Sequence, residues 1–255
     1  SVAAGSFVAA TGNVITAANT TSGATGVDTL GADSAKVSQV ASNNVPANVD
    51  NTATAGAFTV NGQYGVLTIN EDGSYSYARN AGTPGNVSDV FNYTLKDGDN
   101  DTSPATLTIA IGDSTPTNVI PGAGGPTTTV YEAGLPARGG EPAGSDSAAN
   151  SERVAGTVAF TSLDGLSVVS LGGHALTLVD QTFSDGLTAR YSYNAATGAG
   201  VITYSYTLAD NTLGDNTTAS FAVVVTDADG DSAPAGNLVI NIVDDVPTAR
   251  ADSDS

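Results

Sequence analysis

The stretch Phe221–Val243, FAVVVTDADGDSAPAGNLVINIV, consists of two apolar runs on either side of an acidic segment that contains glycine and proline. The first run is rich in valine, which favours β-strands. In the second run Leu238, Ile240 and Ile242 stand at alternate positions, so they share one face of a strand and should point into a core. The stretch therefore predicts a strand, an acidic loop over 227–236 and a second strand.

A second copy of this pattern lies upstream in the chain. Phe91–Thr117, FNYTLKDGDNDTSPATLTIAIGDSTPT, aligns with Phe221–Thr248 when one inserted residue is allowed in the later copy. The two copies share the three Asp of the acidic segment, both prolines and the alternating Leu-Ile-Ile. A match over so long a window is not accidental, and it indicates two related units in tandem.

Each unit contains a further hairpin signal. In YGVLTINEDGSYSYA (Tyr64–Ala78) and in ARYSYNAATGAGVITYSYTL (Ala189–Leu208), turn residues separate two alternating runs. No stretch shows helical periodicity with caps. The predicted fold class is therefore all-β, with two tandem β-sandwich domains.

Composition shifts place the domain boundaries. We predict a first β-sandwich over 1–113, a Gly/Pro-rich linker over 114–128 and a second β-sandwich over 129–255, of which 246–255 begins a linker to a following domain. The tract Arg138–Glu152 is predicted as a loop between the first and second strands of the second domain.

The charge of the chain limits its partners. The 255 residues carry a net charge of −19 from 26 acidic and 7 basic residues, and all but four of the acidic residues are Asp. Asp favours turns and is a ligand for hard cations. A chain this acidic is repelled by phosphate, so neither a nucleic acid nor an anionic membrane surface is an expected partner.

Other features of the composition bear on location. There is no Cys, which fits a secreted protein that uses metal in place of disulfides but does not exclude a cytosolic one. No run of 18 apolar residues is present, so no membrane insertion is expected. The first residues, SVAAGSFVAATGN, lack the basic region of a signal peptide, and the sequence resembles an excerpt from a longer protein.

The two acidic segments are candidate calcium sites. Ca²⁺ takes six to eight oxygen ligands, and alternating Asp residues on a tight loop converge on one point. The alternative is that such Asp-Gly and Asn-Asp pairs only favour turns and bind no ion. Two copies at matching positions favour calcium, because three like charges without a cation would repel one another. The candidate ligands are Asp97, Asp99 and Asp101 in the first copy and Asp227, Asp229 and Asp231 in the second.

Other metal sites fit less well. A zinc site is disfavoured because the chain has no Cys and one His. An EF-hand requires a bidentate Glu at the twelfth loop position, where the two copies have Thr108 and Leu238.

Three stretches resemble a known family. DADGDSAPAGNLVINIVDDVPTA (Asp227–Ala249), YEAGLP (Tyr131–Pro136) and TGNVITA (Thr11–Ala17) are similar to the tandem immunoglobulin-like and cadherin-like (VCBS-type) repeats of giant bacterial RTX adhesins, which are exported by type I secretion. The resemblance covers both units and is weakest over Ala41–Ala57.

That resemblance implies an extracellular, calcium-binding β-sandwich module in a long fibre on a Gram-negative cell surface. Its partners would be neighbouring repeats of the same polypeptide, and calcium would stiffen the joints between domains. NIVDDVPTA (Asn241–Ala249) also resembles the interdomain linker of cadherins, which implies that Asp244 and Asp245 are acidic ligands.

Strand direction adds further expectations. In a seven-strand sandwich the first and last strands run the same way, so the last hairpin loop lies where the chain enters the domain. The loop of Asp227, Asp229 and Asp231 should then lie near Asp113 and Glu132. By the same argument the Asp97 loop faces whatever precedes Ser1, and Asp244 and Asp245 face whatever follows Ser255. The linker is longer than a tight cadherin joint, so the sequence leaves open whether an ion is shared between domains.

The remaining candidate residues have simpler structural explanations. His174 lacks a nucleophile and an orienting group nearby, so no catalytic role is expected. The alternating tyrosines at 75 and 77, 191 and 193, and 204 and 206 could stack on sugars but more simply fill one face of a strand. Glu71 and Asp72 precede Gly73 in a hairpin turn and do not form the separated pair of a glycoside hydrolase.

The sequence therefore predicts a monomeric, non-enzymatic, calcium-stiffened extender of a surface adhesin that mediates cell adhesion and biofilm formation. The alternative is a glycan- or peptide-binding module of the same kind of adhesin. A ligand-binding module should contain a concave pocket and a cluster of exposed aromatic residues, whereas an extender should contain neither.

Overall fold

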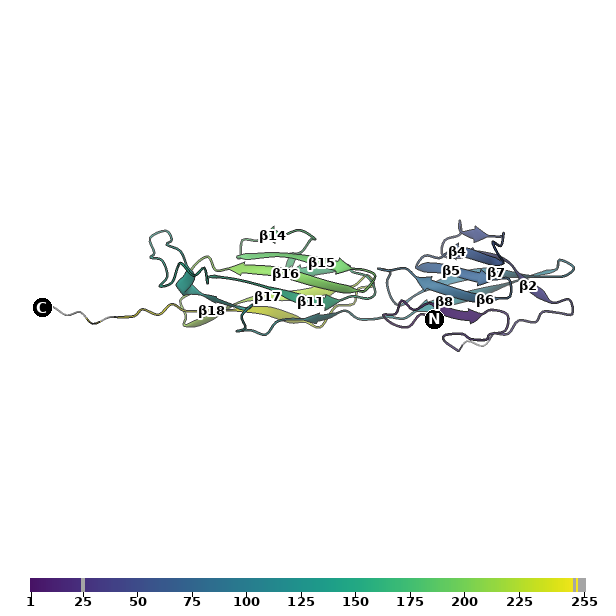
Figure 1. Cartoon of the computed structure of the whole chain (residues 1–255), viewed down its shortest axis with the longest axis horizontal. Coiled ribbons are helices and arrows are strands. Elements are labelled where there is room, and N and C mark those ends of the chain that lie inside the picture. Colours follow the sequence, from purple (N-terminus) through teal and green to yellow (C-terminus); the bar gives the residue numbers. More distant parts are fainter. Residues whose placement is uncertain (24–25, 250, 252–255) are drawn as a thin grey trace. The chain divides into compact units, whose positions relative to one another are not determined.

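The structure is a computed structural model that describes residues 1–23, 26–249 and 251. The chain divides into two compact units, each built from two sheets (Figure 1). Unit 1 comprises residues 1–115 and two short segments, Leu163–Gly165 and Asp227–Gly230. Unit 2 comprises 116–162, 166–226 and the residues from 231 onward. The predicted all-β fold with tandem β-sandwich domains is confirmed.

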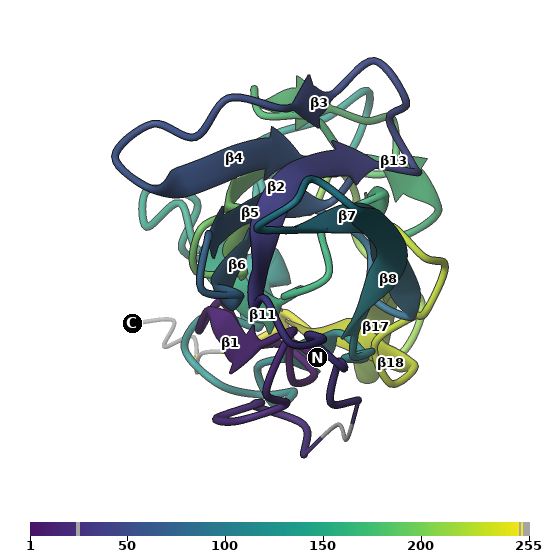
Figure 2. The ribbon, with the colours of Figure 1, turned by 90° about the vertical axis from the view of Figure 1, so that its right-hand side faces the viewer.

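Unit 1 consists of two four-stranded sheets, ordered β1-β6-β5-β4 and β3-β2-β7-β8. Figure 2 shows β1, β5 and β6 on one side of this unit and β7 and β8 on the other. Buried side chains from both sheets form one core, in which the rings of Tyr77 and Phe91 meet edge to face with centroids 6.1 Å apart. The strands are β1 (Ala10–Asn13), β2 (Ala35–Ser42), β3 (Val49–Asp50), β4 (Ala57–Asn61), β5 (Gly65–Asn70), β6 (Ser74–Arg79), β7 (Val87–Asp97) and β8 (Thr102–Ile111).

Unit 2 consists of two five-stranded sheets, ordered β14-β15-β16-β11-β9 and β10-β18-β17-β12-β13. In its core Tyr206 contacts Phe221 with ring centroids 5.6 Å apart, the counterpart of the Tyr77–Phe91 contact. The elements are β9 (Thr117–Val119), β10 (Thr129–Tyr131), the 3-10 turn η1 (Glu132–Gly134), β11 (Arg153–Thr161), β12 (Val168–Leu171), β13 (His174–Ala175), β14 (Gln181–Thr182), β15 (Leu187–Asn194), β16 (Ala199–Thr207), β17 (Asn216–Thr226) and β18 (Gly236–Val243).

The alternation that defined the opening stretch is confirmed. Leu238 and Ile240 are fully buried and Ile242 is 5% exposed. The two hairpins predicted from turn residues are also present, as β5–β6 and β15–β16. Among the described residues no helix is long and apolar enough to cross a membrane.

In each unit a segment near the start runs parallel to the last strand, as expected. In unit 2, β10 pairs with β18 in parallel register, and in unit 1 Val2 forms a parallel bridge with Ile111. This arrangement follows from a chain that enters and leaves a sandwich at opposite ends.

The two acidic hairpins differ in width. In unit 1, β7 continues to Asp97 and β8 begins at Thr102, so the turn is tighter than the predicted loop. Pro104 lies inside β8, which is tolerated because β8 is an edge strand. The later hairpin has a longer connection, from Asp227 to Ala235, between the end of β17 and the start of β18, and within it Ser232 forms an isolated bridge with Thr226.

The segment predicted as a linker contains regular structure. Residues 117–119 form β9, which pairs antiparallel with β11, and Thr128 is fully buried. Thr128 donates its hydroxyl to the carbonyl of Gly122, and its side-chain oxygen accepts the amide of Gly125. These contacts order a Gly/Pro-rich tract whose composition alone favours flexibility.

Candidate metal centres

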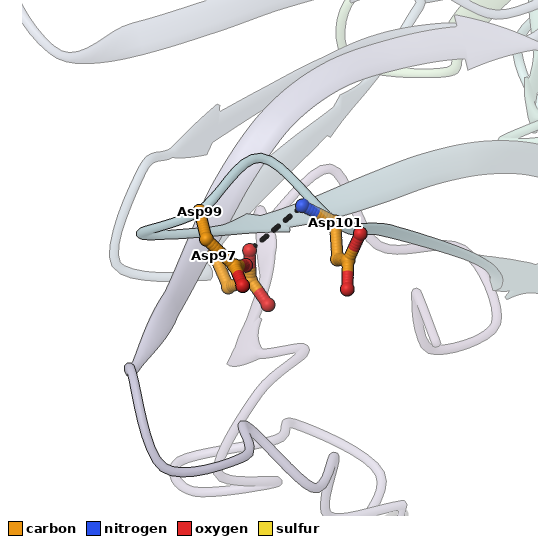
Figure 3. A group of neighbouring side chains, drawn as sticks. All are labelled: Asp97, Asp99 and Asp101. Carbon is orange, nitrogen blue, oxygen red and sulfur yellow. Dashed lines mark hydrogen bonds between the residues drawn. The ribbon is translucent and has the colours of Figure 1, made fainter.

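Two groups of acidic side chains bring their oxygens within 4.8 Å of one another among the described residues. The first, here the hairpin group, is Asp97, Asp99 and Asp101 on the β7–β8 turn (Figure 3). The second, here the Asp164 group, is Asp113, Asp164 and Asp229. All members of the second group belong to unit 1.

The hairpin group is shaped by its own backbone. Asp97 Oδ1 accepts the amide of Asp101 at 2.8 Å, and the amide of Asp97 donates to the carbonyl of Asp101 at 3.1 Å. Asn100 closes the turn with a positive φ of 79°, a conformation that Asn tolerates better than most residues. A hydrogen bond with Asp99 is the largest cause of a lowered pKa of Asp97, and turn amides add to it. This group is exposed or half-exposed.

The Asp164 group combines one buried and two exposed carboxylates. The Asp164 side chain is fully buried: its Oδ1 lies 3.0 Å from Arg79 Nη2, and its Oδ2 accepts the amide of Ser114 at 2.6 Å. Asp113 and Asp229 are exposed. The group therefore consists of one buried carboxylate, Asp164, which is held in place by Arg79, and two exposed carboxylates, Asp113 and Asp229, which a cation can reach from solvent.

Glycines make the close approach to Asp164 possible. A Cβ at Gly85 would collide with the Asp164 carboxylate and lie 2.9 Å from the Asp113 Cα. A Cβ at Gly165 would lie 2.6 Å from the carbonyl oxygen of Gly82, and Gly165 also has a positive φ of 83°. The bare backbone at these positions lets Asp164 reach Asp113.

Burial, with nearby acidic groups, raises the pKa values of two members of this group. Burial raises the pKa of Asp164, and the charge of Asp229 raises it further against the opposing effect of Arg79. Burial likewise raises the pKa of Asp229, as do a hydrogen bond with Asp227 and its charge, while a hydrogen bond with Asp113 lowers it. Carboxylates that share hydrogen bonds hold protons where a divalent cation would relieve the same repulsion.

Asp227 and Asp231 lie on the same loop but differ in position. Asp227 is fully buried, and its Oδ1 accepts the amide of Gly230 at 3.0 Å. It supports Asp229 through the hydrogen bond already described. Asp231 belongs to unit 2 and is not part of the Asp164 group.

Glu132 is not near Asp227, contrary to the expectation from strand direction. It is 4% exposed, and its Oε1 accepts the amide of Thr212 at 2.6 Å and the Thr212 hydroxyl at 2.7 Å. A buried carboxylate needs such donors, and they hold Glu132 within unit 2.

Asp244 and Asp245 lie at the same end of unit 2 as Glu132. These three residues line a pocket of about 390 Å³, whose other lining residues include Arg138, Glu141 and Asn211. Burial and the neighbouring Glu132 raise the pKa of Asp244. Asp245 is engaged by Ser145, which donates its amide at 2.7 Å and its hydroxyl at 2.5 Å, and these bonds lower the pKa of Asp245.

The structure thus brings together all three residues predicted in the first acidic segment, and it brings Asp229 to Asp113. The sequence missed Asp164 and its partner Arg79. Asp164 stands in a short LDGL turn with no counterpart in the other repeat, so only its Asp-Gly pair marked it. Arg79 ends β6 and shows no local pattern of a site.

The donor chemistry of both groups fits a hard cation. All the side-chain donors are carboxylate oxygens, which suit Ca²⁺, and neither group contains His or Cys. In the Asp164 group, burial is the largest cause of the raised pKa values of Asp164 and Asp229, and neighbouring acidic groups add to it.

The other candidates have structural roles. His174 stacks on Phe183 with centroids 3.9 Å apart, and its Nε2 lies 2.8 Å from Asp185. The alternating tyrosines are buried or half-buried against the two cores. Glu71 pairs with Lys36 at 2.9 Å, and Asp72 accepts the amide of Ser74 at 2.9 Å.

Residues 3–113 match the family model of the bacterial cadherin-like domain. Unit 1 is therefore similar to a bacterial cadherin-like domain, which fits an extracellular, adhesin-type module. A search of curated proteins finds no match.

Similar solved structures include the crystal structure of Dpr2 Ig1-Ig2 in complex with DIP-Theta Ig1-Ig3, at 13% identity and a TM-score of 0.27, covering 86% of this chain and 88% of that one. They also include murine CEACAM1b, at 11% identity and a TM-score of 0.23, covering 82% of this chain and 87% of that one. Similarities at these TM-scores carry no argument about function.

Proposed function

We propose that this chain is a calcium-binding structural module of a bacterial surface adhesin, in which neighbouring repeats of the same polypeptide extend a fibre that mediates cell adhesion and biofilm formation. The Asp164 group is the observation that carries this proposal. It gathers three carboxylates around one point, with a buried member whose charge is only partly compensated. A protein retains such a group at a cost in stability unless a cation occupies it.

Asp113, Asp164 and Asp229 would hold one ion. Asp227 would orient Asp229 through the hydrogen bond between the two side chains. Asp97, Asp99 and Asp101 would hold a second, more exposed ion on the hairpin. A bound Ca²⁺ would neutralise the repulsion within each group and fix its loops. Asp244, Asp245 and Glu132 would contribute to a further site only if additional oxygens were supplied from a following repeat.

Extracellular location and type I export from a Gram-negative cell belong to the same proposal. Their support is the similarity of residues 3–113 to a bacterial cadherin-like domain and the lack of Cys in the chain. Millimolar calcium outside the cell would saturate sites with dissociation constants of about 10⁻⁴–10⁻³ M, the range of extracellular modules.

The test is a thermal and calorimetric titration of the full chain. About 10 mM Ca²⁺ should stabilise the folded protein over EDTA by about 1.4–2.7 kcal/mol for each site of that affinity. Isothermal titration should show saturable heat for Ca²⁺ and a weaker response to Mg²⁺, which demands octahedral geometry and releases water reluctantly.

Matched variants assign the heat to each group. Asp113→Asn with Asp229→Asn should remove one binding event, and Asp99→Asn with Asp101→Asn the other. Asp180→Asn removes one negative charge at a side chain that is 66% exposed and lies outside both groups, so it should leave binding intact. Identical melting curves in EDTA and calcium would remove the basis of the proposal.

The alternative, a glycan- or peptide-binding module, has less support. Among the described residues only Tyr131 is an aromatic side chain of the exposed class, at 45% exposure. The tyrosines on which a sugar-binding face would depend pack against the cores instead. The pocket at Arg138 is acidic and lacks an aromatic floor.

A further inference from the structure

A groove of about 560 Å³ lies along one side of unit 1. One wall is the β8 stretch from Ala105 to Thr108, and the opposite wall includes Asn13, Ala17 and Asp28. Tyr75 and Tyr93 also line it. The groove therefore runs beside an edge strand of the sandwich.

The backbone of β8 is open along this groove. Val2 donates its amide to the carbonyl of Ala110 at 2.8 Å, so the polar backbone groups of Ala110 point away from β7. Alternation along a strand gives Thr108, Thr106 and Pro104 the same direction. Among the described residues, none forms a hydrogen bond to this outer edge between Pro104 and Thr108.

Unit 2 shows what occupies the same position in the related fold. Tyr75 faces Gly12 across β6 and β1, and Tyr204 faces Gly156 across β16 and β11. The neighbouring tyrosines support this equivalence, because Tyr77 meets Phe91 as Tyr206 meets Phe221, and the two Phe are aligned in the repeat.

In unit 2 the position is filled by residues 118–128, here the crossover segment. Tyr204 donates its hydroxyl to the carbonyl of Thr127 at 3.0 Å and is 1% exposed. The amide of Asn241 donates to the carbonyl of Thr128 at 2.9 Å. The crossover segment thus runs beside β18 and leads into β10.

The other end of the crossover segment is also anchored. The side-chain amide of Asn118 donates to the carbonyl of Pro234 at 3.1 Å. The side chain of Ile120 packs against the unit 2 core and lies where a Cβ on Gly236 would be, at 2.6 Å. The segment therefore contacts the chain at Pro234 and Gly236, where β18 begins, and at Asn241 further along β18.

Unit 1 presents the matching groups, and none of its described segments crosses them. Pro104 aligns with Pro234, and Ala110 aligns with Asn241. Tyr75 is half-buried, and its hydroxyl forms no hydrogen bond with any described residue. The acceptor surface for a crossover segment is thus present in both units.

We propose that the groove of unit 1 binds an uncharged segment of the crossover type, joined to Ser1 and supplied by a preceding repeat. The segment would run parallel to β8, because Val2 already pairs in parallel with Ile111. One of its carbonyls would accept the Tyr75 hydroxyl, another the amide of Ala110, and an apolar side chain would cover Ala105. This inference rests on the proposed function, since a neighbouring repeat of the same polypeptide provides the segment.

The experiment adds the segment in register. Ser1 corresponds to Thr129, so a copy of residues 116–128 is fused directly before Ser1 of the full chain. The control carries a Gly/Ser extension of equal length. Amide hydrogen exchange should slow by at least about tenfold at Ala110 in the first protein relative to the control, because this amide, the counterpart of that of Asn241, would be newly paired and must open before it exchanges.

A second comparison isolates the tyrosine anchor. Tyr75→Phe in the extended chain should partly reverse the protection of Ala110, and Tyr204→Phe should accelerate exchange at Asn241 as the internal reference. Equal exchange at the β8 edge in the two extended proteins would overturn the inference. The calcium-induced rise in melting temperature is measured in the same samples. If that rise is missing, the proposed calcium-binding function is wrong, whatever the exchange at β8 shows.

Discussion

Arg79 offers the sharpest test of how the Asp164 group is balanced. The side chains of Arg79 and Asp164 are both fully buried, and their closest atoms lie 3.0 Å apart. Arg79→Met keeps an unbranched apolar stem but leaves the Asp164 carboxylate without its counter-charge. Removing one partner of a buried ion pair costs about 3–5 kcal/mol, so in EDTA unit 1 should lose about that much stability.

Native-state hydrogen exchange measures this loss unit by unit. The slowest amides of β7 report unfolding of unit 1, and those of β17 provide the internal reference in unit 2. A loss of about 3–5 kcal/mol corresponds to exchange roughly a hundredfold to several thousandfold faster at β7, with little change at β17.

Calcium and a second substitution separate charge from packing. Saturating Ca²⁺ should recover much of the loss, because the ion replaces the missing positive charge beside Asp113 and Asp229. Arg79→Met combined with Asp164→Asn should be more stable in EDTA than the single variant, because the uncompensated charge is gone. If the single variant loses less than about 1 kcal/mol, or if the double variant is no better, the ion pair does not balance the group as described.

Three further predictions concern the pH dependence of the Asp164 group, the Tyr77–Asp89 hydrogen bond and the core position of Leu238. In EDTA, Asp164 and Asp229 should add to the free energy of unfolding as the pH falls through their raised folded-state pKa values, because the folded state takes up these protons first; saturating Ca²⁺ should remove this contribution, and urea titrations of the wild type and of Asp229→Asn at each pH isolate it from the opposite effect of the carboxyls with lowered pKa values. Tyr77→Phe should cost about 1.5–3 kcal/mol in urea unfolding, because the Tyr77 hydroxyl donates to the buried Asp89 carboxylate; no loss would indicate that the remaining donors to Asp89 suffice. Leu238→Ala should cost about 2–5 kcal/mol, measured by exchange in β17, and an unchanged rate would contradict its place in the core.

The strands were predictable because their signals are local. Alternation at Leu238, Ile240 and Ile242 has the period of a strand, and the Glu-Asp-Gly turn before Ser74 fixes a hairpin without reference to distant residues. The repeat then supplied the tandem organisation, since the second copy had to fold as the first does.

The Asp164 group was only partly predictable because it depends on contacts across long stretches of chain. Asp113 and Asp229 carried signals from the repeat, but Asp164 did not. Glu132 was misplaced because strand direction alone ignores the need of a buried carboxylate for donors, which Thr212 meets. The widths of the acidic hairpins also differ although their Asp and Pro residues align, since β8 tolerates Pro104 at an open edge.

In each unit a segment near the start pairs in parallel with the last strand, and this pairing determines how the unit responds to a pulling force. A pull applied to the start of β10 and the end of β18 drives the two strands past each other along their length. The pairs from Thr129–Asn241 to Tyr131–Val243 are then sheared together instead of being unzipped one at a time. Unit 1 has the Val2–Ile111 bridge at the corresponding place, and any further backbone pairs along β8 would share the load under the same force.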